Sequence, residues 1–257
     1  MRIGCAAYSY REYFTKGIMG LEDFIKMGYE LGLDGVELTV YYFKSTDDSY
    51  VFKLKRLALE YGLDIPCVSV GNNFTEPEQA RRKEQVDYVK RWLDVASKLG
   101  APCLRIFAGK VPKGYTEDDA FKWTVDCIKE CVEHASKLGI VLVLENHGGI
   151  TSTADQVLKI INAVNSDWLA LNLDIGNFVV NRYENIRKVA PYALHVHAKF
   201  YKPTPFGDEE IDYTIVLRIL REVGYKGYLS IEYEGKEEAK SAVPRAVSFL
   251  RKAVGVS

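Results

Sequence analysis

One short pattern recurs along the chain: a segment with helical periodicity ends on glycine, and a run rich in apolar residues follows. The glycines at these points are Gly32, Gly62, Gly100, Gly139 and Gly224. Glycine suits the residue after a helix because that position often needs a positive φ angle, which costs glycine least. Each occurrence therefore indicates a connection from a helix to a strand, and the chain is predicted to alternate between the two.

The strand candidates are short and strongly apolar. Residues 140–144 (IVLVL), for example, lack polar alternation, which is typical of parallel strands buried on both faces. The clearest helices are Glu78–Leu99 and Asp118–Leu138, and Thr116 and Ser152 are expected to begin helices because their hydroxyls can cap free amides. The expected strands are Arg2–Tyr8, Gly35–Val40, Ile65–Val70, Cys103–Phe107, Val141–Glu145, Leu169–Asp174, Leu194–His197 and Tyr228–Glu232.

Alternating strands and helices can build either a doubly wound sheet or a closed barrel, both of the α/β class. The strand count and the length of 257 residues are those of a (β/α)8 TIM barrel. No GxGxxG or GxxxxGK[ST] motif follows the first strand, so a nucleotide cofactor has no support. Because the chain has no linker, low-complexity tract or shift in composition, one barrel domain is expected over residues 1–257.

Composition argues against several classes of protein. The formal net charge is -1, with Lys and Arg dispersed, so neither nucleic acid nor a membrane surface is an expected partner. Every apolar run is shorter than the roughly 18 residues that a membrane span needs, and the first residues lack a signal-peptide pattern. The five cysteines form no paired framework, which favours free thiols in a reducing compartment, the cytoplasm.

Residues capable of chemistry end the last four expected strands: Glu145, Asp174, His197 and Glu232. A (β/α)8 barrel carries its active site at the C-terminal ends of its strands, so these side chains should meet at one mouth. Three carboxylates and an imidazole there would repel unless a cation neutralised them. Oxygen ligands with one nitrogen suit Mn²⁺, Mg²⁺ or Co²⁺, with Zn²⁺ a further candidate. The sequence therefore predicts one divalent metal ion.

Four segments at these strand ends form recognisable motifs. They are LENHGGITSTADQVLKII (144–161), LNLDIGNF (171–178), HVHAKF (195–200) and GYLSIEYEG (227–235). With them the chain resembles the xylose-isomerase-like superfamily of sugar phosphate isomerases and epimerases, and the likeness covers nearly the whole chain. Its members are metal-dependent barrels, so the resemblance implies that Glu145, Asp174, His197 and Glu232 bind the metal. It also implies that Glu145 and Glu232 are catalytic, since they serve as acid and base in the ketose epimerase branch.

The implied activity is isomerisation or epimerisation of a sugar or sugar derivative, in carbohydrate metabolism. One glutamate removes the proton beside a carbonyl, and the metal stabilises the negative charge of the enediolate that forms. The opposite glutamate returns a proton to the other face and gives an epimer, whereas return to the neighbouring carbon gives an aldose–ketose isomer. A small sugar or polyol is therefore the expected substrate.

Two residues near the predicted ligands are expected to bind substrate. His147 lies just past the fifth strand and precedes Gly148 and Gly149, which permit close approach of the backbone to a ligand. Lys199 lies on the strand face of His197 by period-two alternation. It could neutralise an enediolate, carboxylate or phosphate, or equally be a solvated lysine at the start of a loop.

Two residues from the first strands are also expected to bind substrate. Tyr8 and Glu37 end their strand runs, where each could hydrogen-bond a sugar hydroxyl. Glu37 could equally be a buried carboxylate paired with Arg105. His195 shares the strand face of the seventh-strand ligand but lies one layer deeper, so it is expected to orient a ligand or pack in the core.

The chain departs from the ketose 3-epimerases at two points. They carry a histidine three residues after the sixth-strand aspartate, where this chain has Asn177. They also carry an arginine shortly after the seventh-strand histidine, where Lys199 is the nearest cation here. The resemblance therefore does not extend to how the substrate is recognised.

Other functions compete with this prediction. A dehydratase (lyase) acting on a keto-cyclitol or dehydroshikimate-like substrate would use the same metal site and then expel a β-hydroxyl. The apurinic endonuclease branch needs many metal-binding histidines and a DNA-binding face, which four histidines and a net charge of -1 oppose. A non-catalytic sugar-binding protein would not need a metal between two bases. The aromatic residues near the loops suit either packing or a homo-oligomer interface.

Overall fold

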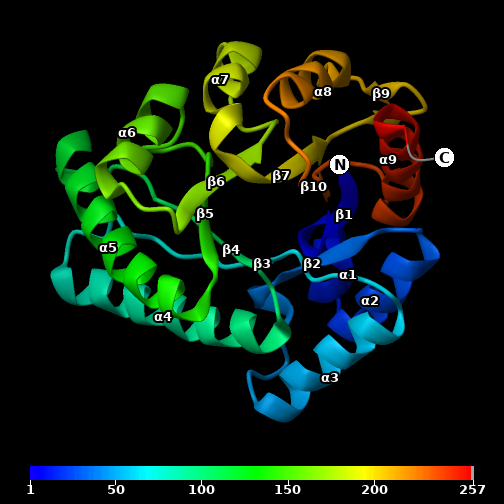
Figure 1. Ribbon diagram of the computed structural model, residues 1–257, viewed down its shortest axis with the longest axis horizontal. Helices are drawn as coiled ribbons and strands as arrows, with labels where there is room; N and C mark the ends of the chain where they lie inside the picture. The colour runs from blue at the N-terminus through cyan, green and yellow to red at the C-terminus, as the bar shows by residue number, and fades with distance from the viewer. Residues whose placement is uncertain (256–257) are drawn as a thin grey trace.

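The computed structural model describes residues 1–255 and contains a closed barrel of eight parallel strands, as the sequence predicts (Figure 1). The strands follow the order β1-β10-β7-β6-β5-β4-β3-β2, so the first strand pairs with both the second and the last. The barrel strands are β1 (Arg2–Ala6), β2 (Gly35–Thr39), β3 (Cys67–Ser69), β4 (Cys103–Ile106), β5 (Val141–Glu145), β6 (Leu169–Asp174), β7 (Ala193–Phe200) and β10 (Tyr228–Tyr233).

Helices form an outer ring around the strands, and α9 packs beside β1 where the ring closes (Figure 1). The helices are α1 (Arg11–Thr15), α2 (Leu21–Glu30), α3 (Asp48–Glu60), α4 (Gln79–Leu99), α5 (Glu117–Leu138), α6 (Ala154–Val164), α7 (Arg182–Val189), α8 (Tyr213–Glu222) and α9 (Ala239–Val254). The remaining elements are the 3₁₀ turns η1 (Ala7–Tyr10), η2 (Val40–Tyr42) and η3 (Ala190–Tyr192), and a hairpin of β8 (Pro203–Thr204) and β9 (Gly207–Asp208).

The recurring glycines end helices as predicted. Their φ angles are 67° at Gly32, 67° at Gly62, 81° at Gly100, 68° at Gly139 and 71° at Gly224. These values lie in the left-handed region, where a side chain with a Cβ is disfavoured. The repeated pattern therefore marks real connections from helices to strands, and each one delivers the next strand to the barrel.

One of the two predicted helix starts is correct. The hydroxyl of Thr116 accepts a hydrogen bond from the third amide of α5, so Thr116 is the N-cap. Ser152 is not the cap of α6, because its hydroxyl donates to the carbonyl of Gly149. Thr153, one residue later, accepts from the amide of Gln156 and begins the helix.

The predicted strand ends need two corrections that bear on the site. The first strand ends at Ala6 rather than Tyr8, because the chain enters the turn η1, and Tyr8 belongs to that turn. The seventh strand continues past His197 to Phe200, so Lys199 is a strand residue and not the start of a loop. As a result, Tyr8 lies in a turn at the mouth of the barrel, and Lys199 lies within β7.

Two distinct cores stabilise the fold. The larger lies between the outer faces of the strands and the helices, and burial of its apolar side chains is the main contribution to stability. The smaller consists of Cys67, Cys103, Val143 and Ala170, on strands β3 to β6. Above this small cluster the inward-facing side chains are polar, which leaves the interior near the C-terminal ends of the strands available for chemistry.

All five cysteines are free and buried, in agreement with the prediction of unpaired thiols. Within residues 1–255, every helix is too short or too polar to cross a lipid bilayer.

Candidate active site

The four predicted metal ligands lie close together, with the three carboxylates around one ring nitrogen of His197. Asp174 on β6 and His197 on β7 are partners in the strand register, and Glu145 and Glu232 come from the strands on either side. The Nδ1 atom of His197 lies 3.4 Å from Glu145 Oε2, 3.5 Å from Glu232 Oε1 and 3.7 Å from Asp174 Oδ2. All four side chains are buried.

One atom of this group, Nδ1 of His197, is buried and has no hydrogen-bond partner. An unsatisfied polar atom in a protein interior is costly and needs an explanation. Ligand atoms of Glu145, Asp174 and His197 all lie within 4.8 Å of one another, the spacing of donors around a single cation. These residues therefore fit a divalent metal ion.

The pKa values of His197 and Glu145 are both raised, but for different reasons. Burial opposes the charged imidazole, but the carboxylates of Glu37, Glu232 and Glu145 raise the pKa of His197 well above its usual value. Burial raises the pKa of Glu145 to about 7, although Arg105 and His197 oppose this. Positive charge beside Glu145, from Arg105 and His197, favours its ionised form.

The carboxylate of Glu145 is held by three side chains. Asn172 Nδ2 donates to Oε2 at 3.0 Å, and Asn177 Nδ2 donates to Oε1 at 3.2 Å. Arg105 Nε lies 3.2 Å from Oε2, and its guanidinium stacks over the ring of Phe107 at 3.9 Å. Arg105 thus pairs with Glu145, not with Glu37, and Asn177 also contacts Glu145.

Lys199 is almost completely buried, with 1% of its surface exposed, so the alternative of a solvated lysine is wrong. Its Nζ lies 3.0 Å from Asp174 Oδ2 and 3.2 Å from Glu234 Oε2, and it also pairs with Glu232. Gly176 makes room for this side chain, because a Cβ there would lie 2.5 Å from Lys199 Cγ. Lys199 therefore neutralises part of the carboxylate cluster.

Glu37 does not suit the expected contact with a substrate. Its side chain has 0% exposure and lies inside the barrel. Ser69 and Ser230 donate to it, the latter at 2.7 Å, and its oxygens lie 2.9 Å from His195 Nε2 and 3.0 Å from His197 Nε2. Its lone pairs are therefore occupied by protein donors, and we reassign it below. The deeper position expected for His195 is confirmed.

Tyr8 lies in turn η1 at the mouth, partly buried, with the guanidinium of Arg11 5.2 Å from its ring centre. Burial and the nearby carboxylate of Glu234 raise the pKa of its hydroxyl, so the group stays protonated and can donate a hydrogen bond. This position is compatible with a contact to a bound molecule.

His147 is exposed and its ring stacks on Phe107, with ring centres 4.3 Å apart. Both residues line a cavity of about 410 Å³ together with Asn72, Thr75 and other residues that follow β3, β4 and β5. Ligand pockets commonly begin at roughly 300 Å³. Phe107, in the wall of this cavity, also contacts Arg105, the residue that pairs with Glu145.

Gly149 packs closely against a neighbouring loop, whereas the space around Gly148 is open. Both have positive φ angles, 67° and 55°. A Cβ on Gly149 would lie 2.2 Å from the carbonyl oxygen of Gly109, so two loops touch here. The contact shapes the wall of the cavity beside His147.

The sequence reasoning missed several polar residues of the interior. The side chain of Asn146 forms two hydrogen bonds with the backbone of Asp174: it donates to the carbonyl at 2.9 Å and accepts from the amide at 2.8 Å. Asn172 and Ser230 each lie two residues before a predicted ligand, on the same strand face. Period-two alternation, which located His195, could have identified both.

Comparisons with known proteins agree with this architecture. A family model described as xylose isomerase-like TIM barrel matches residues 25–253. The L-ribulose-5-phosphate 3-epimerase UlaE of Escherichia coli (strain K12) is 24% identical over 253 residues, covering 88% of this chain and 87% of the relative.

Solved structures share the fold. A D-psicose 3-epimerase structure determined in the presence of D-fructose superposes with a TM-score of 0.83 at 17% identity, covering 99% of this chain and 100% of that one. The probable 3-DHS dehydratase AsbF of Bacillus anthracis gives a TM-score of 0.77 at 16% identity, covering 97% of this chain and 98% of that one. The family model spans most of the sequence, and the chain therefore belongs to the xylose isomerase-like TIM barrel family.

Proposed function

We propose that this protein is a sugar or sugar-derivative epimerase or isomerase that uses one divalent cation held by Glu145, Asp174, His197 and Glu232. The observation that carries the proposal is the buried, unpaired Nδ1 of His197 with three carboxylates within 3.7 Å. The epimerase activity named for the UlaE relative supports the same reaction class.

A divalent ion in this position, for which Mn²⁺, Mg²⁺ and Co²⁺ are the best matches to the donors, supplies a Lewis acid for a substrate carbonyl. Every proton must then be moved by the protein. Glu145 and Glu232 are the groups able to do so, because both are buried carboxylates at the mouth of the barrel.

The order of the strands separates these two carboxylates. β5 and β10 flank β6 and β7 in the barrel, so Glu145 and Glu232 stand at the two ends of an arc of four strands. A substrate bound over His197 would present one face to each glutamate. We propose that one glutamate removes the proton beside the carbonyl and the other donates a proton to the opposite face, which inverts the carbon.

The rest of the mouth suits a polar substrate. Lys199 adds a positive charge beside Glu232, where it limits the cost of negative charge developing on the substrate. His147 and Tyr8 offer hydrogen bonds to hydroxyls from opposite parts of the mouth, at β5 and β1. We propose these three side chains as substrate contacts.

A deuterium-exchange screen tests the proposal. The Mn²⁺-loaded protein is incubated in D₂O with ketoses, ketose phosphates and keto-cyclitols, and proton NMR follows exchange at the carbon beside the carbonyl. Exchange that yields an epimer or an isomer supports the function. Loss of water with formation of an enone would instead indicate the dehydratase. Absence of exchange with every substrate class, in protein shown to contain Mn²⁺, would contradict the proposal.

A further inference from the structure

Glu37 is the acceptor of an unusual number of hydrogen bonds. Side chains from three other strands, β3, β7 and β10, surround its carboxylate on β2. An ionised carboxylate only accepts hydrogen bonds. Each group that faces it must therefore present a hydrogen, and this includes the Nε2 atoms of both His195 and His197.

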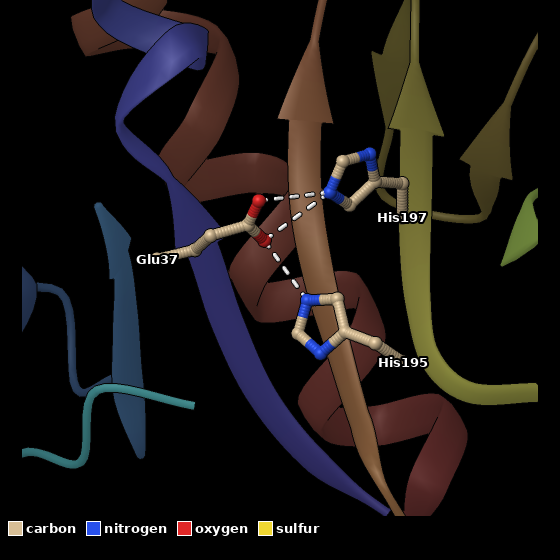
Figure 2. A group of neighbouring side chains, drawn as sticks. All are labelled: Glu37, His195 and His197. Atoms are coloured by element: carbon tan, nitrogen blue, oxygen red, sulfur yellow. Dashed lines mark hydrogen bonds and ion pairs between the residues drawn. The ribbon is translucent and has the colours of Figure 1, made fainter. Parts of the chain in front are cut away.

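The two histidines contact Glu37 from different levels of the barrel. Figure 2 shows Nε2 of each ring facing the carboxylate, while the second nitrogen of each ring points away from it. For His197 that second nitrogen is the unpaired Nδ1, which faces Glu145, Asp174 and Glu232. The ring thus bridges Glu37 and the carboxylate cluster.

We propose that Glu37 is a positioning residue: it holds His197 with hydrogen on Nε2 and so leaves the Nδ1 lone pair to a cation among Glu145, Asp174 and Glu232. The inference rests on the proposed function, because it needs the cation, but it is independent of which reaction follows. The partner of one imidazole nitrogen determines which nitrogen can bind a metal.

Glu37 disfavours the other neutral tautomer of the His197 ring, which carries its hydrogen on Nδ1. Three carboxylates near Nδ1 would favour the tautomer with hydrogen on that atom, and this tautomer excludes a metal. The carboxylate of Glu37 at Nε2 offsets this preference, because it accepts a hydrogen bond from a hydrogen on Nε2. The side chains that face Glu37 are all able to donate a hydrogen bond, which is the arrangement expected around an ionised carboxylate.

A second metal ion bound by Glu37, His195 and His197 is a weaker explanation for this cluster. Their ligand atoms are close enough together for such a site. However, the oxygens of Glu37 lie 2.9 Å and 3.0 Å from the ring nitrogens, which are hydrogen-bond distances. The hydroxyls of Ser69 and Ser230 also donate to the same oxygens. The carboxylate is fully occupied by these donors.

Mn²⁺ affinity measures the proposed role without any substrate. In Glu37→Gln a single acceptor oxygen must serve the same donors, and the new amide adds N–H groups of its own. We expect Mn²⁺ binding, followed by calorimetry, to weaken about 10–100-fold. Ser230→Ala is the matched control, because it removes a donor to Glu37 and leaves the acceptor of His197 unchanged. Unaltered Mn²⁺ affinity in folded Glu37→Gln would overturn the inference.

Nitrogen-15 NMR of the histidine rings tests the wild-type protein directly, so the inference does not depend on the variant folding. The chain has four histidines, and His134→Gln and His147→Gln identify two of the signals. With Zn²⁺ bound, His197 is expected to carry hydrogen on Nε2 only; a hydrogen on Nδ1 would overturn the proposal. Failure of the wild type to bind Mn²⁺ or Zn²⁺ would refute the proposed function. In that case a neutral ring with hydrogen on Nδ1 would overturn the role of Glu37 as well.

Discussion

The two halves of the barrel differ in what they contribute to the site. The arc β5-β6-β7-β10 carries the four candidate ligands and Lys199, whereas the arc β1-β2-β3-β4 carries Glu37, Ser69 and Arg105. Residues of the second arc contact the ligands from behind: Arg105 at Glu145 and Glu37 at His197. Under the proposed function, the later half of the chain supplies the reactive groups, and Glu37 and Arg105 of the earlier half help to set their orientation and charge.

The largest effect is expected from substitution of Glu145 and Glu232, the two glutamates at the ends of the arc β5-β6-β7-β10. Glu145→Gln and Glu232→Gln should each slow solvent deuterium exchange about 10²–10⁴-fold, because an amide does not transfer a proton. Exchange is measured with saturating Mn²⁺, and bound metal is quantified in each variant. Glu234→Gln is the control, since Glu234 also contacts Lys199 but lies further from His197. Wild-type exchange rates in both variants would remove the proposed roles.

The next largest effect is expected from removing the positive charge of Lys199 on β7. Lys199→Met leaves the buried carboxylates of Asp174 and Glu232 without their cation, which should lower the free energy of unfolding by roughly 3–5 kcal/mol. Urea unfolding in the presence of a chelator measures this, and Mn²⁺ should restore more stability to the variant than to the wild type. Lys202→Met, at an exposed lysine just beyond the end of β7, should have little effect. Equal stability of Lys199→Met and wild type would show that the pairing contributes nothing.

Metal binding should stabilise the wild type by about 2.7 kcal/mol when free Mn²⁺ is one hundred times its dissociation constant. The increase is measured as a rise in the midpoint of thermal unfolding, and EDTA should reverse it together with the exchange activity. Asp174→Asn is the control, because it removes one carboxylate oxygen from the proposed site. A midpoint that stays constant up to millimolar Mn²⁺ would argue against metal binding.

The smallest effect is expected from a substitution in the other arc, β1-β2-β3-β4, which carries Arg105. Arg105 lowers the pKa of Glu145, which burial otherwise raises to about 7. Arg105→Gln removes that positive charge, so the pKa of Glu145 should increase. If Glu145 is the base, activity increases as it loses its proton, and this limb of the pH profile should move to higher pH. Arg91→Gln, on an exposed position of α4, should leave the profile unchanged.

Much of the fold was predictable because its signals are local. Glycine at the end of a helix and an apolar run after it depend on a few neighbouring residues, and all five glycines have the expected backbone. The same holds for Glu145, Asp174, His197 and Glu232, which lie at or near the C-terminal ends of their strands, because these ends meet at one rim in a parallel barrel. Their convergence follows from order and spacing alone.

The ends of strands and the partners of buried charges were less predictable. Nothing local distinguishes a strand ending at His197 from one ending at Phe200, yet this difference decides whether Lys199 is solvated or buried. Likewise, a sequence with Arg105, Glu37 and Glu145 allows two pairings, and only their distances select Arg105 with Glu145.

The sequence alone thus determined the alternation of helices and strands, the barrel, and the four side chains at its mouth, since each depends on short-range periodicity. The tertiary structure decided which of the inward-facing residues touch. Glu37 and His197 are 160 positions apart, and they meet only because pairing of β1 with β10 closes the barrel and brings β2 and β7 around one interior. Contacts across a closed barrel depend on register and closure, which no local stretch of the chain encodes.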